Sequence, residues 1–78
     1  MKLETLTAIL TPHYGEASQA TATQALNGLS KSPMRNFADG TLTRLINRVL
    51  PNVTKHSNPL DNARELVISM YELETTDE

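Results

Sequence analysis

The 78-residue chain contains no cysteine, no tryptophan and only three aromatic residues. Without cysteine it cannot form a disulfide bond, a thiolate-ligated zinc site or a thiol nucleophile. Because aromatic side chains are so few, leucine, isoleucine and valine must supply most of the core, and alanine allows helices to approach closely. A small domain without disulfides fits a reducing compartment, which favours a cytoplasmic location.

Long apolar segments are also missing. No run approaches the roughly 20 apolar residues of a membrane-spanning helix. The first residues lack the apolar stretch and the small-residue cleavage site of a secretory leader. We therefore expect a soluble protein without membrane contact. The length is that of one domain, and the sequence predicts a folded region at residues 1–74 and a polar tail at residues 75–78.

Apolar residues recur at intervals of three and four, which is the spacing of amphipathic helices. The clearest stripe consists of Leu42, Leu45, Ile46, Val49 and Leu50. Two cap-then-proline pairs, Ser32-Pro33 and Asn58-Pro59, predict a short helical turn and the start of a C-terminal helix. The inward-facing residues of that helix should be Leu60, Ala63, Leu66, Val67, Met70 and Leu73. We expect the stripe helix and the C-terminal helix to be the main packing pair.

Two weaker helical patterns precede these. One covers residues 2–11 and should end at Pro12, and the other covers residues 16–27 and should end at Gly28. No segment alternates with a period of two for long enough to form a strand. The sequence therefore predicts an all-α fold, a compact bundle of four to five short helices.

The side chains that enzymes and metal sites use are scattered. His13 and His56 are the only histidines, and neither has a second His, Asp or Glu at a ligand spacing. A zinc site needs three or four converging ligands. No serine or threonine lies in a nucleophile motif, and the three glycines are isolated from one another. We therefore expect no enzyme activity, no catalytic residue, no metal and no cofactor.

The charge is unevenly distributed, although the net charge is only −2. Residues 31–55 carry five basic residues and one acidic residue, whereas residues 56–78 carry one basic residue and six acidic ones. The candidate partner-binding residues are Lys31, Arg35, Arg44 and Arg48. They could contact an anionic surface of a partner. The alternative is internal pairing of the two later arginines with acidic residues of the C-terminal helix, which are Glu65, Glu72 and Glu74.

Two functions fit these features. The first is a non-catalytic protein–protein interaction module, such as an adaptor, assembly factor or inhibitor, that uses charged helix surfaces; a second copy of the chain is one partner that it allows. The alternative is a small DNA-binding regulator of helix-turn-helix type, with Arg44 and Arg48 on the second helix. The pI of about 5.6 and the long connection before that helix favour the protein-binding hypothesis.

One stretch carries a resemblance to a known family. The segment Ala63-Arg64-Glu65-Leu66-Val67 follows a Leu50-Pro51 break and a loop at residues 55–59. In this respect the last third of the chain resembles the final helices of some bacterial effector-associated, death-fold-like domains. Those domains are small helical adaptors that recruit partners through similar domains. The resemblance implies an adaptor and assigns no binding residues.

Overall fold

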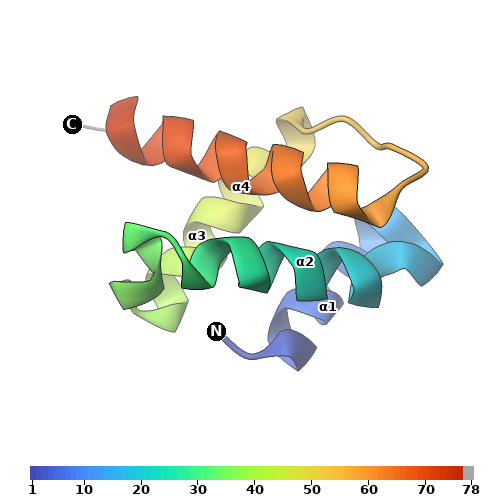
Figure 1. Ribbon diagram of the computed structural model, residues 1–78, viewed down its shortest axis with the longest axis horizontal. Helices are drawn as coiled ribbons and strands as arrows, with labels where there is room; N and C mark the ends of the chain where they lie inside the picture. The colour runs from blue at the N-terminus through green and yellow to red at the C-terminus, as the bar shows by residue number, and fades with distance from the viewer. Residues whose placement is uncertain (77–78) are drawn as a thin grey trace.

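The computed structural model describes residues 1–76, and every regular element in that range is helical (Figure 1). The α-helices are α1 (Leu3–Tyr14), α2 (Ser18–Ser30), α3 (Asp39–Val49) and α4 (Pro59–Thr76). Single turns of 3-10 helix occupy Gly15–Ala17, Pro33–Asn36 and Leu50–Asn52. The predicted all-α class is confirmed. The helices form one body of 34 × 22 × 20 Å.

The helices form two layers. In Figure 1, α2 and α4 run side by side in the same direction, and α1 and α3 lie behind and below them. The principal neighbour of α4 is α2, and α4 packs less extensively against α3. The expected main pairing of the last two helices is therefore wrong.

The close approach of α2 to α4 involves a small residue of α2, Gly28. Ala22 and Ala25 are fully buried, and a Cβ atom at Gly28 would lie only 3.2 Å from Cγ2 of Val67. The absence of larger side chains lets the two helix backbones approach closely. Gly28 therefore serves helix packing. It does not end α2, which continues to Ser30, and the predicted end at residue 27 is wrong.

Pro12 does not end α1 either, because the helix continues through it to Tyr14. A proline removes one hydrogen bond, to the carbonyl four residues earlier. That carbonyl belongs to Ala8, an exposed residue that water can reach. The helix ends at Gly15, whose φ of +57° suits glycine and whose N–H donates to the carbonyl of Thr11.

The Ser32-Pro33 prediction is confirmed as a single 3-10 turn. The Ser32 hydroxyl accepts a hydrogen bond from the backbone N–H of Met34 at 3.0 Å. At the other end of the chain, α4 continues to Thr76. Asp77 and Glu78, the last residues of the predicted tail, lie outside the described part of the chain.

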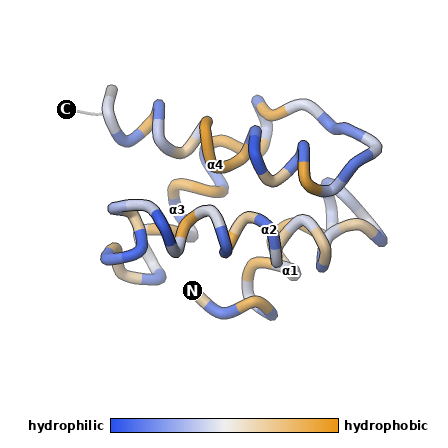
Figure 2. The backbone as a smooth tube through the Cα atoms, in the orientation of Figure 1, coloured by the Kyte–Doolittle hydropathy of each residue, from blue (hydrophilic) through white to orange (hydrophobic). Residues whose placement is uncertain are grey.

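The core lies between the two layers. Each helix shows apolar segments interrupted by polar ones along its length (Figure 2), as expected for helices with one buried face. The fully buried large apolar side chains of the core include Leu6, Leu10, Ile46, Leu66 and Met70. Leu60, which the sequence places inward, is 37% exposed, so that assignment is wrong. In residues 1–76 no helix combines the length and apolar character needed to cross a membrane.

Candidate functional site

A shallow apolar groove of about 290 Å³ lies where α2 meets α4. The α4 residues that line it are Leu60, Ala63, Arg64, Val67 and Ile68. On the other side it is lined by Gln24, Asn27 and Gly28 of α2 and by Lys31, which directly follows α2. On both helices these positions recur at intervals of three and four, so the groove follows the two helix axes. At 1.5 Å per residue its length is about 12 Å, or slightly more than two helical turns.

The apolar side of the groove is open to solvent. Ile68 is 56% exposed, and Leu60, two turns earlier on the same face of α4, is 37% exposed. Tyr71, one turn beyond Ile68, is also 37% exposed. Exposed apolar side chains that gather on one helix face mark interaction sites more often than scattered ones do.

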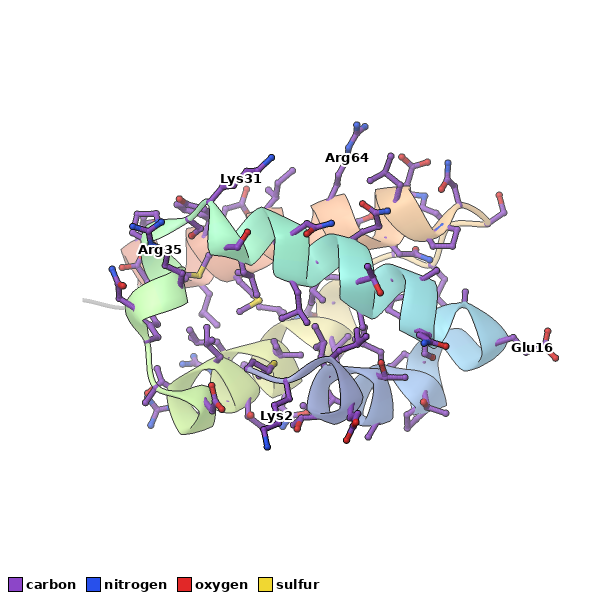
Figure 3. All side chains as sticks on the ribbon, turned by 60° about the horizontal axis from the view of Figure 1, so that its bottom comes forward. Lys2, Glu16, Lys31, Arg35 and Arg64 are labelled. Carbon is purple, nitrogen blue, oxygen red and sulfur yellow. The ribbon has the colours of Figure 1, made fainter. Side chains whose placement is uncertain are left out.

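Two basic side chains flank this apolar surface. Lys31 closes the C-terminal end of α2, and Arg64 lies in the second turn of α4. Figure 3 shows both side chains extending from the same side of the molecule. Both residues are exposed, and neither forms an ion pair with any residue that the structure describes. The residues that line the groove include no carboxylate, so its net charge is positive.

The four candidate partner-binding residues do not form one patch. Lys31 lines the α2/α4 groove, whereas Arg35 lines a separate hollow with Met1 and Leu42. The Nη1 atom of Arg35 lies 3.5 Å from the carbonyl of Ser30, a long hydrogen bond. Figure 3 shows Arg35 and Lys31 at the same end of the molecule.

The other two candidates lie on α3. Arg44 and Arg48 are both exposed. Arg48 lines a third hollow, between α3 and α4, together with Glu72. Arg48 therefore lies close to α4, as the alternative of its pairing with an acidic residue of that helix requires. Glu65, another acidic residue considered for that pairing, interacts instead with the loop before α4.

That loop is attached to α4 by polar contacts. The N–H of Thr54 donates to Oε1 of Glu65 at 3.0 Å, and the ring of His56 contacts the other carboxylate oxygen. The Thr54 N–H first, and the His56 contact second, hold the pKa of Glu65 below its ordinary value. Asn62 is buried; its side chain accepts from the His56 N–H at 2.6 Å and donates to the His56 carbonyl at 3.0 Å.

Tyr14 lies near the same cluster. Burial, and secondarily the negative charge of Glu65, raise the pKa of its phenol. The His56–Glu65 pair lines none of the hollows described above. The arrangement fixes the loop on α4. Within residues 1–76 no three His, Asp or Glu side chains come together as metal ligands.

The groove, with its lining residues Arg64 and Ile68, was not predicted from the sequence. A signal was present, because α4 carries apolar residues on more of its circumference than one buried stripe can absorb. Comparison of the chain with protein-family models, with curated proteins and with solved structures found no match.

Proposed function

We propose that this protein is a non-catalytic protein-interaction module, an adaptor, assembly factor or inhibitor, that binds another protein through the α2/α4 groove. The observation that carries the proposal is that Ile68, which lines an apolar groove, is 56% exposed to solvent. Burial of this surface in a complex would stabilise that complex through the hydrophobic effect, by about 25 cal/mol per Å² of apolar area removed from water. A partner with a complementary apolar surface would supply that burial.

The lining of the groove favours binding over catalysis. It contains apolar side chains, two amides and two basic groups, but no paired nucleophile and base. The resemblance of the C-terminal third to death-fold-like adaptors supports the same role, although it names no surface. The absence of cysteine favours the cytoplasm as the place where the module acts.

DNA binding is the second candidate, because Arg44 and Arg48 are exposed and four residues apart on α3. A helix-turn-helix joins two mutually packed helices by three or four residues. Here residues 31–38 separate α2 from α3, and these two helices share few contacts. We therefore rank DNA binding below protein binding.

The test of protein binding compares Ile68→Glu with the matched variant Leu3→Glu, which places the same charge on an exposed apolar residue of α1. Each tagged protein is used to capture partners from cells that produce it, and its melting temperature is measured as a folding control. A partner, once purified, should bind the wild type and Leu3→Glu directly but should bind Ile68→Glu at least about tenfold more weakly. Equal binding of the Ile68→Glu variant would refute the proposal.

The test of DNA binding uses the double variant Arg44→Glu/Arg48→Glu. If DNA is the partner, affinity should fall steeply with the logarithm of salt concentration, and the double variant should lose binding. Negligible DNA binding by the wild type at about 50 mM salt would remove this candidate, because phosphate contacts are strongest at low salt.

A further inference from the structure

We infer that the occupant of the α2/α4 groove is an amphipathic helix of the partner protein whose apolar stripe is flanked by aspartate or glutamate. This inference rests on the proposed function and adds the chemistry of the partner. It follows from the shape of the groove and from the charges beside it.

The shape of the groove suits a helix. The helices α2 and α4 run side by side (Figure 1), and the groove between them follows their axes. The side-chain ridge of a third helix fits into such a groove. Gly28 and Ala63 contribute little or no side chain at its base, and Val67 and Ile68 supply apolar contacts. A length of slightly more than two turns accommodates apolar anchors at i, i+3 or i+4, and i+7 of a bound helix.

The charges specify the residues that flank the bound helix's apolar stripe. Lys31 and Arg64 extend on the same side of the molecule as shown in Figure 3, and neither has an ion-pair partner within residues 1–76. Neither acidic neighbour of Arg64 forms an ion pair with it. Asp61, three residues earlier, makes no ion pair with it, and Glu65 is engaged by Thr54 and His56. Carboxylates on the partner would therefore pair with both cations, whereas lysine or arginine there would be repelled.

Nucleic acid fits this surface poorly. Phosphate binding depends on many basic contacts, and the groove offers two, beside Leu60 and Ile68 with their exposed apolar side chains. The apolar area would remain without a complementary surface on a phosphate backbone.

The test uses a displayed library of 18-residue helices that share one leucine stripe. The positions beside the stripe carry Asp/Glu, Lys/Arg or Gln/Ser. We compare the wild type with Lys31→Glu/Arg64→Glu, and use Lys2→Glu/Arg44→Glu as the control. The control reverses one lysine and one arginine that do not line the groove and are exposed. All three proteins should fold, because exposed charges contribute little to stability.

The wild type and the control should enrich helices flanked by Asp/Glu, and Lys31→Glu/Arg64→Glu should enrich helices flanked by Lys/Arg. A synthetic acidic helix from the selection should bind Lys31→Glu/Arg64→Glu at least about fivefold more weakly than the control. Its binding should also be lost in Ile68→Glu.

Enrichment without charge preference, or enrichment that persists in Ile68→Glu, would overturn the inference. No enrichment of any helix would also overturn it. In these cases the proposed function stands if capture of a whole partner protein still depends on Ile68, and it fails too if that capture is absent. If the protein alone forms a dimer in sedimentation, and Ile68→Glu abolishes that dimer, then a second copy occupies the groove and the acidic helix is ruled out.

Discussion

The two faces of α4 provide a direct test of the fold. Leu66 has 0% of its surface exposed, whereas Ile68, two residues later, is 56% exposed. Truncation of each residue to alanine removes a similar amount of apolar side chain from the same helix. The free energy of unfolding should therefore fall for the first variant and change little for the second.

The burial of each side chain sets the expected magnitude. A fully buried Leu→Ala substitution costs about 3–4 kcal/mol, because it loses the transfer free energy and leaves a cavity. The total stability of a domain of this size is about 4–12 kcal/mol, so Leu66→Ala should remove a large part of it. Since 1 kcal/mol corresponds to about 4–8 °C, its melting temperature should fall by at least about 12 °C.

Ile68→Ala should cost less than about 1 kcal/mol. More than half of the Ile68 side chain already contacts solvent, and alanine has the higher helix propensity, which offsets part of the lost contact. Urea unfolding followed by circular dichroism measures both variants. Equal destabilisation of the two variants, or a stable Leu66→Ala protein, would refute the orientation of α4.

Other predictions concern the loop before α4 and the turn after α2. Asn62→Ala should cost about 1–3 kcal/mol, because it removes both hydrogen bonds between the buried Asn62 side chain and the backbone of His56; an unfolding curve unchanged from wild type would contradict this. The pKa of Glu65 is lower in the folded protein than in the unfolded chain, so its contribution is present above the ordinary value of 4.5 and is lost as the pH falls through the lowered value. In acid titrations monitored by melting temperature, Glu65→Gln should therefore show a weaker loss of stability below about pH 4.5 than the wild type, and identical profiles would exclude this role. Ser32→Ala removes the hydroxyl that accepts from the Met34 N–H and should cost about 1 kcal/mol in the same urea assay, whereas Ser30→Ala, at an exposed site, should cost less.

The sequence predicts most clearly the features that depend on local pattern. The stripe from Leu42 to Leu50 forms the buried face of α3 and continues into the following 3-10 turn. The Ser32-Pro33 pair forms the capped turn that its chemistry favours. Hydrophobic spacing and capping act over a few residues, so a single sequence contains both signals.

Features that depend on tertiary packing could not be predicted in this way. Gly28 looks like a helix end in the sequence, yet its position against Val67 keeps it inside α2. The close approach of α2 to α4 depends on Gly28, which meets Val67 across the interface. The groove is likewise formed by two helices together. Lys31 and Arg64 are far apart in the sequence and fall in segments of opposite net charge, although they flank the same surface.

The central claim is that a protein partner binds at the α2/α4 groove. Site-specific photo-crosslinking tests it most directly, with a photoreactive amino acid placed at position 68 or at the exposed control position 3. We predict that a partner protein crosslinks from position 68 and not from position 3. A partner that co-purifies with both proteins but crosslinks equally from the two positions, or only from position 3, would contradict the claim.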